Sequence, residues 1–295
     1  MFNCFFFGIF LWYKIYYLMK AIFDIGANKG QNLSYFLDKA DIVVAIEANI
    51  NLVKQIKSDF KQFIDNKKLI VENVALIDDE NVKNIDFYIS KVNDVLSTLY
   101  PDDKSKFYKQ EVRCEKASLL INKYLKKYDI SQIEYIKIDI EGADDLVLND
   151  LLKNNILCEN LSVECHKSEV LELLLNSKFK SFKFVEGGDV TFKKNIEITN
   201  KLNEKKIINF DIHSSGPYGD DIPGDYYDKN SILTYFLNKG LGWKDIHCSL
   251  KEKKYFSKIK YKPGIYQQGF RYHLKKLLPS FIKAMRKKIY NVFNL

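Results

Sequence analysis

Short apolar segments alternate with longer amphipathic ones along residues 21–176, and this alternation constrains the fold more than any other feature of the sequence. The apolar runs are too short for buried helices and are predicted to be strands; they cover residues 21–25, 41–49, 69–77, 85–90, 135–140 and 160–165. The segments between them are predicted to be helical, at 30–38, 50–64, 117–128, 144–153 and 169–176. Strands that alternate with helices form parallel sheets covered on both faces, so we predict an α/β protein with a mostly parallel sheet.

Polar side chains follow the predicted strands at the point where each strand ends. Ligands of such sheets bind beyond the carboxyl ends of the strands, and these ends meet at one edge. The polar residues expected there are Asp24, Glu47, Asn73, Asp139, Glu141, Glu164 and His166. We therefore expect the functional site at this edge.

The remaining sequence divides into three further regions. Residues 1–18 are apolar except for Asn3 and Lys14, and are interpreted either as an over-long predicted start or as a membrane anchor. The main domain is placed at 19–204. Residues 205–250 are rich in Gly, Pro, Asp and Ser and are expected to form a loop-rich extension, with a short helix at 231–238 and a possible edge strand after it. Residues 251–295 form a basic amphipathic tail.

The charge of the chain is unevenly distributed. Its net charge is +8, yet residues 251–295 hold 13 Lys and Arg and one acidic residue, so that the rest of the chain carries −4. A mildly acidic body argues against nucleic-acid binding by the main domain. The five cysteines have no CxxC spacing, which argues against a disulfide framework or a structural zinc site and fits a cytoplasmic protein.

The loop after the first predicted strand, with Asp24, Gly26 and Gly30, distinguishes between classes of ligand. A dinucleotide loop has three glycines that bring backbone N–H groups to a pyrophosphate, whereas this loop has two and carries Asp24 before them. A carboxylate there would repel pyrophosphate and favour a ligand with a positive charge. S-adenosylmethionine fits, since it has an ammonium and a sulfonium group. Glu47, at the end of the next strand, is placed to accept hydrogen bonds from two ribose hydroxyls.

Four motifs in this order, FDIGANKGQ, AIEAN, VENVAL and IKIDIEGAD, closely resemble those of the FkbM family of S-adenosylmethionine-dependent methyltransferases. The resemblance covers about residues 21–190 and implies a class I, Rossmann-like methyltransferase fold. It also implies roles for individual residues. The loop residues Asp24, Gly26, Ala27, Asn28 and Gly30 would hold the methionine part of the cofactor and Glu47 its ribose. Asn73, Val74 and Ala75 would border the adenine, and Asp139 would face the reacting centre.

Methyl transfer to an alcohol requires a group that accepts the proton of the hydroxyl. The candidates are Asp139, Glu141, Glu164 and His166, which end or follow the fourth and fifth strands of the domain. Glu164 and His166 lie two residues apart on a predicted strand and would share a face. Glu164 and Asp139 could alternatively hold a divalent cation, although two carboxylates alone do not indicate one.

The acceptor is expected to bind near the extension. Aromatic, acidic and hydroxyl groups together suit a sugar, and the candidate residues are His213, Asp220, Asp221, Trp243 and His247. Members of the resembling family often O-methylate sugars or other secondary metabolites, so a glycan or a related small molecule is the expected acceptor. The basic tail either packs on the body or binds an anionic surface, which would bring the protein to the inner face of a membrane.

Two other functions remain open from the sequence. One is a binding protein that keeps the cofactor fold without catalysis, since no single residue is certain as the base. The other is a nucleic-acid methyltransferase that uses the basic tail as an electrostatic contact. A nicotinamide-dependent dehydrogenase is disfavoured because the third glycine of its loop is missing.

Overall fold

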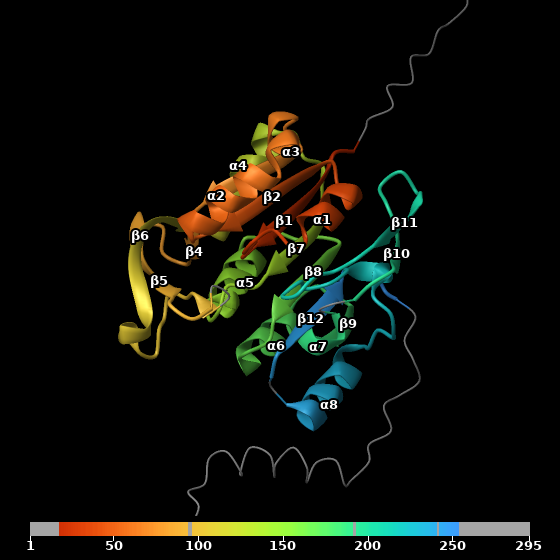
Figure 1. Ribbon diagram of the computed structural model, residues 1–295. Helices are drawn as coiled ribbons and strands as arrows, with labels where there is room; N and C mark the ends of the chain where they lie inside the picture. Colours follow the sequence, from red (N-terminus) through yellow and green to blue (C-terminus); the bar gives the residue numbers. More distant parts are fainter. Residues whose placement is uncertain (1–17, 94–95, 191–192, 241, 254–295) are drawn as a thin grey trace, which may run out of the picture.

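The computed structural model describes residues 18–93, 96–190, 193–240 and 242–253. Its central element is a seven-stranded sheet in the order β3 (Leu69–Asn73), β2 (Ile42–Glu47), β1 (Lys20–Ile25), β7 (Gln132–Ile138), β8 (Asn160–Glu164), β12 (Lys244–Ser249) and β9 (Ser181–Glu186) (Figure 1). Neighbouring strands from β3 to β8 are parallel, and β12 runs antiparallel to both β8 and β9. The predicted mostly parallel sheet is confirmed.

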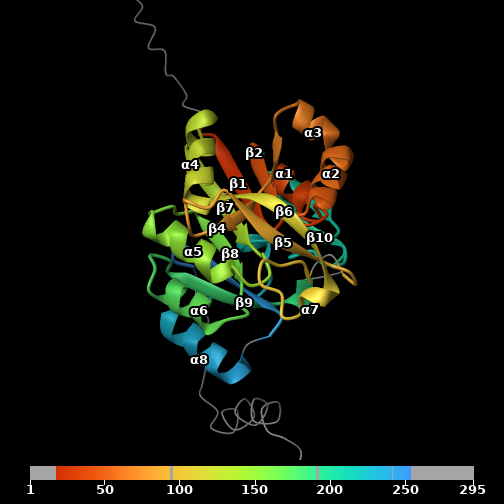
Figure 2. The same cartoon turned by 90° about the vertical axis from the view of Figure 1, so that its left-hand side faces the viewer.

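Helices cover both faces of this sheet, as predicted. One face packs against α4 (Ala117–Lys127), α5 (Asp144–Lys153) and α6 (Ser168–Leu175), with Ile232 of α8 (Lys229–Lys239) at the edge of the same core. The opposite face packs against α1 (Leu33–Lys39) and α2 (Ile50–Asp59), which α3 (Lys61–Asp65) follows. Figure 2 shows α4, α5 and α6 on one side of the strands and α2 and α3 on the other. The strands are apolar along most of their length because both faces are covered.

Two smaller sheets accompany the main one. A three-stranded sheet in the order β4 (Ala75–Ile77), β6 (Phe107–Lys116) and β5 (Asn84–Ser90) has its own small core around Phe87 and Val112. A hairpin consists of β10 (Ile196–Thr199) and β11 (Lys205–Ile208). The short helix α7 (Gly187–Val190) directly follows β9, and single 3-10 turns lie at Lys104–Lys106 and Gly219–Asp221.

Several predicted elements differ in their extent. The run 69–77 is two strands in two sheets, because the chain turns at Val74, whose N–H donates to the carbonyl of Glu47. The predicted helix 50–64 is interrupted at Phe60, whose backbone angles leave the helical region and which ends α2 and precedes α3. The predicted helix 30–38 begins at Leu33, since residues 30–32 form the end of the loop. Strands β6 and β9, and the strands β10 and β11 of the hairpin, were not predicted.

The expected edge strand of the extension is wrong in its position. Residues 244–249 form β12, which lies between β8 and β9 inside the main sheet. Cys248 is buried and Ile246 contributes to the core of the α4, α5 and α6 face. The extension therefore completes the sheet of the domain that precedes it.

The predictions for the two ends of the chain concern residues outside the described ranges. They are the apolar segment 1–18, of which only Leu18 is described, and the amphipathic tail beyond residue 253. Within the described ranges, no helix combines the length and the apolar character needed to cross a bilayer.

Candidate active site

A cavity of about 440 Å³ lies at the carboxyl ends of β1, β2, β7 and β8, the edge where the sequence places the site. Its volume lies in the usual range for small-molecule sites. Most of its wall residues come from four regions, and Leu96, Ser97 and Leu99 add to them. Gly26, Ala27, Asn28, Gln31 and Asn32 come from the loop after β1; Glu47, Val74, Ala75 and Phe87 come from β2 and the small sheet; Lys137, Asp139, Glu141, Glu164 and His166 come from the ends of β7 and β8; Gly187, Val190, His213, Ser214, Ser215, Trp243 and Asp245 come from the C-terminal part.

The loop after β1 is shaped by its two glycines. Gly26 has φ +83°, and a Cβ atom there would lie 1.8 Å from the carbonyl oxygen of Asp139. Only glycine therefore lets the chain pass this close to the end of β7. Gly30 has φ +80° and packs beneath Leu33 and Phe60, and it does not line the cavity. Gly26 thus shapes the cavity directly, whereas Gly30 supports the start of α1.

Glu47 connects this loop with the end of β2. One carboxyl oxygen accepts a hydrogen bond from the backbone N–H of Asn28 at 2.9 Å, and the other from that of Asn49 at 2.8 Å. Burial raises the pKa of Glu47 to about 7, although both hydrogen bonds act in the opposite direction. Asn73 does not line the cavity and instead donates to the carbonyl groups of Glu47 and Ala48. Val74 and Ala75 do line it.

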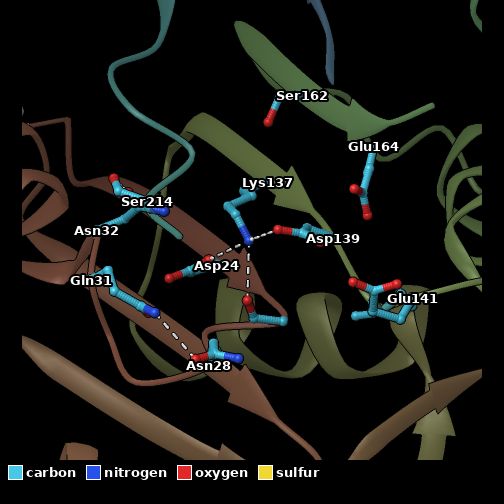
Figure 3. Close-up of polar contacts among 12 residues, drawn as sticks. Asp24, Asn28, Gln31, Asn32, Lys137, Asp139, Glu141, Ser162, Glu164 and Ser214 are labelled. Atoms are coloured by element: carbon cyan, nitrogen blue, oxygen red, sulfur yellow. Dashed lines mark hydrogen bonds and ion pairs between the residues drawn. The ribbon is translucent and has the colours of Figure 1, made fainter. Parts of the chain in front are cut away.

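A buried lysine compensates the carboxylates at the centre of the site. Lys137 Nζ lies 3.0 Å from Asp139 Oδ2 and 3.6 Å from Asp24 Oδ1, and it donates to the carbonyl oxygen of Gly26 at 3.0 Å (Figure 3). Burial raises the pKa of Asp24 to about 6, against the attraction of Lys137. Burial acts the same way on Asp139, but the ion pair with Lys137 prevails and lowers the pKa of that carboxyl.

The position of Asp24 corrects the sequence-based argument. Asp24 is 1% exposed and does not line the cavity, since Lys137 occupies the place next to it on β7. Its charge therefore faces the ammonium group of Lys137 rather than a bound ligand. Asp139, in contrast, lines the cavity with its ion pair to Lys137 intact.

All four predicted base candidates line one end of the cavity. His166 Nε2 lies 2.9 Å from Glu164 Oε2 and 3.9 Å from Glu141 Oε2, and Asp139 is on the same side. Burial raises the pKa of Glu141 to about 7, with a contribution from Asp139. Burial and the charges of Asp139 and Asp245 raise the pKa of Glu164 far above its usual range. Near neutral pH this end of the cavity can therefore both accept and donate protons.

The predicted acceptor residues divide into two groups. His213 and Trp243 line the cavity, and the indole of Trp243 packs directly on Gly187, where a Cβ atom would lie 2.2 Å from the ring. The other three residues do not line it, and the prediction for them is not supported. Asp220 pairs with Lys253, Asp221 pairs with Lys39 and accepts from Tyr35, and His247 is buried within β12.

Two charged cavity residues were not assigned a role from the sequence. Lys137 stands in the quoted motif IKIDIEGAD, and its charge between the apolar residues Ile136 and Ile138 was the available signal. Asp245 lies between Trp243 and His247 in the sequence, but it reaches the cavity only because β12 pairs with β8 beside Glu164. No local pattern indicates that pairing.

Comparisons with known proteins show which family the chain resembles. The family described as Methyltransferase FkbM domain matches residues 24–185. Among solved structures, the methyltransferase FkbM from Methylobacillus flagellatus KT is 15% identical with a TM-score of 0.37, over 57% of this chain and 40% of its own length. TrmK from M. capricolum, solved with S-adenosylhomocysteine, is 13% identical with a TM-score of 0.34, over 93% of this chain and 88% of its own.

A third similar structure is an S-adenosylmethionine-dependent O-methyltransferase from Thermotoga maritima, 7% identical with a TM-score of 0.34, over 79% of this chain and 60% of its own. Among curated proteins no sequence matches significantly. The strand order, with antiparallel β12 between β8 and β9, is that of a class I methyltransferase. Since the matched region comprises more than half of its residues, the chain belongs to the FkbM methyltransferase domain family.

Proposed function

We propose that this protein is an S-adenosylmethionine-dependent methyltransferase that O-methylates a sugar hydroxyl of a glycan or a related metabolite. The observation that carries the proposal is the shared cavity at the carboxyl edge of the sheet. Glu47 and the loop after β1 form one part of it, and a group of acid–base residues forms another. A cofactor and an acceptor could therefore meet within a single cavity.

The residues of the first part fit the cofactor. Glu47 keeps lone pairs on both carboxyl oxygens beyond the two backbone N–H groups that orient it, and these could accept the ribose hydroxyls. Val74, Ala75 and Phe87 offer apolar surface for the adenine. Gly26 and Asp139 both line the cavity, so the methionine part could lie beside the Asp139 carboxylate. The two-glycine loop gives no cradle of the kind that a pyrophosphate uses.

The acid–base residues suit transfer to a hydroxyl group. S-adenosylmethionine supplies a methyl group on a sulfonium sulfur, and the transfer is an in-line displacement. In such a transfer the acceptor oxygen would form the new O–C bond, the S–C bond would break with its electron pair moving to sulfur, and the hydroxyl proton would pass to a carboxylate. Asp139 and Glu141 line the cavity and are the candidates for the carboxylate that accepts this proton. Enclosure of the site from water and orientation of the two reactants would supply much of the catalysis.

Trp243 supports a sugar as the acceptor. Trp243 is 55% exposed although it lines the cavity and packs on Gly187, so part of its indole is accessible. Ser214, Ser215 and His213 offer polar groups along the same cavity. An aromatic face together with hydroxyl and imidazole groups can bind both the apolar and the hydroxyl-bearing surfaces of a sugar ring.

The first test is isothermal titration calorimetry of the full chain with S-adenosylmethionine, S-adenosylhomocysteine and NAD. We expect the first two to bind and NAD to bind far more weakly. Tighter binding of NAD would overturn the proposal. The second test follows transfer of a labelled methyl group to glycans and small sugars of the source organism, and to its RNA. Label in RNA alone would show that the acceptor is a nucleic acid and not a sugar. Cofactor binding without transfer to any acceptor would favour a binding protein without catalysis.

A further inference from the structure

The side chains of Glu141, Glu164 and His166 bring three possible metal ligands together at one end of the cavity. One donor atom from each lies within 4.8 Å of those of the other two. Figure 3 shows the carboxyl groups of Glu141 and Glu164 turned toward one another from the ends of adjacent strands. From this geometry we infer a binding site for one divalent transition-metal ion, held by Glu141, Glu164 and His166.

A second observation comes from the buried oxygen of Glu164. The residue is 4% exposed, and its Oε2 has no hydrogen-bond partner among the described residues. His166 Nε2 lies 2.9 Å from this oxygen, yet the contact lacks hydrogen-bond geometry. Two ligands about 2.1 Å from one ion and at right angles to each other lie about 3 Å apart, so the two atoms have the spacing of neighbouring metal ligands.

The electrostatic surroundings also favour a cation. The carboxyl groups of Asp139, Glu141 and Asp245 line the same cavity as that of Glu164, so that ionised carboxylates there repel one another. The nearby ammonium of Lys137 is already engaged with Asp139 and Asp24. A divalent ion between the three ligands would offset the repulsion that remains.

The third ligand is held toward the other two by its turn. Glu141 has φ +54°, and Asp144 accepts hydrogen bonds from the backbone N–H groups of Ile140 and Gly142 on either side of it. The hydroxyl of Thr98 donates to the carbonyl oxygen of Glu141 at 2.6 Å. These contacts fix the backbone of the turn, so that the 3.9 Å separation between Glu141 and His166 would change through rotation of the side chains.

The donor set indicates the class of metal. An imidazole nitrogen with two carboxylates suits manganese, iron or zinc better than magnesium or calcium, which prefer oxygen ligands alone. Three protein ligands leave positions open toward the cavity, as in catalytic metal sites. If the proposed function holds, an acceptor hydroxyl on the ion would lose its proton more readily, and Asp139, which is not a ligand, could accept that proton. Binding of the ion itself does not rest on the proposed function.

The test uses the full chain after removal of metals with a chelator. Titration with MnCl₂, with free Mn²⁺ counted by electron paramagnetic resonance, should show one saturable site per chain. Glu141→Gln and His166→Gln should each weaken Mn²⁺ binding at least tenfold, whereas Glu172→Gln, an exposed position on α6, should leave it unchanged. ZnCl₂ should displace Mn²⁺, and MgCl₂ at the same concentration should not.

Melting curves by circular dichroism establish that each variant is folded. No saturable Mn²⁺ binding, or equal binding by the wild type, Glu141→Gln and His166→Gln, would overturn the inference. Equal displacement by MgCl₂ would overturn the transition-metal assignment. Calorimetry with S-adenosylmethionine separates the two proposals, because cofactor binding without Mn²⁺ binding removes only the metal site, and the reverse result removes only the proposed function.

Discussion

Lys137 and Asp24 are register partners on adjacent strands, and their side chains form a buried ion pair with 3.6 Å between Nζ and Oδ1. The side chain of Lys137 is 4% exposed and that of Asp24 is 1% exposed. The same ammonium group also pairs with Asp139 and donates to the carbonyl oxygen of Gly26. One cation thus connects β1, β7 and the first turn of the loop at the wall of the cavity.

We expect Lys137→Met to destabilise the protein by about 3–5 kcal/mol near pH 7.5, because removal of one partner leaves buried carboxylates without a cation. The loss should be smaller at pH 5. Asp24 has a pKa raised by burial to about 6, so its ionisation costs stability as pH rises from 3.8 toward that value. Without Lys137 the pKa of Asp24 rises further. The pH range over which ionisation of Asp24 lowers the free energy of unfolding therefore extends to higher pH.

Urea unfolding at pH 5 and pH 7.5 measures this difference. Lys183→Met is the control, since Lys183 is also buried but donates to backbone carbonyl groups, including those of Ile222 and Gly224. Its effect should be similar at both pH values. A pH-independent loss in Lys137→Met would contradict the ion-pair explanation.

We expect Gly26→Ala to destabilise the protein by about 2–5 kcal/mol, since it combines a left-handed backbone with overpacking. The added Cβ atom would lie 1.8 Å from the carbonyl oxygen of Asp139, so the loop and the end of β7 must separate. Gly188→Ala is the matched control, because no atom lies within 4 Å of its added Cβ. Thermal melting compares the two variants, and equal melting temperatures would show that the loop adapts freely.

Glu47→Ala should weaken the binding of S-adenosylmethionine by about 1.5–3 kcal/mol, the usual range for hydrogen bonds to a charged group. The variant also loses the acceptor that orients Asn28 in the loop. Glu111→Ala, at an exposed position on β6, should bind the cofactor like the wild type. Calorimetry gives both dissociation constants, and an unchanged value for Glu47→Ala would remove this residue from the cofactor site.

Binding of S-adenosylmethionine should release protons between pH 6 and 7. Burial raises the pKa of Glu47 to about 7, so part of the population is protonated in the free protein. Ribose hydroxyls that donate to Glu47 favour its ionised form and lower this pKa on binding. Affinity should therefore rise with pH up to about 7 and then level off.

Calorimetry at pH 6.5 in two buffers of different ionisation enthalpy counts the released protons. Glu47→Gln cannot titrate and should release fewer. Proton uptake by the wild type on binding would contradict the assignment of Glu47 to the ribose.

The local pattern of the sequence determined the framework of this domain. Burial can be predicted locally for the apolar runs of β1, β2, β7 and β8 and for the amphipathic helices between them. Each segment must cover its apolar side, so its pattern of apolar residues indicates which side is buried. Parallel strands end at one edge, so the sequence alone predicted that Glu47, Asp139, Glu141 and Glu164 lie at the same edge of the sheet. The sequence is sufficient for this prediction because each of these residues lies at or just after the carboxyl end of a predicted strand.

The tertiary structure decided which distant segments meet at that edge. The insertion of β12 between β8 and β9 brings Asp245 and Trp243 to the cavity and leaves His247 inside the sheet. The pairing of β12 with β8, about 80 residues earlier in the chain, depends on the free energy of the whole sheet. The local sequence of residues 244–249 does not indicate which strands will pair with it. The compensation of Asp24 by Lys137 likewise follows from the register of two strands, which becomes definite only when the complete sheet buries both faces.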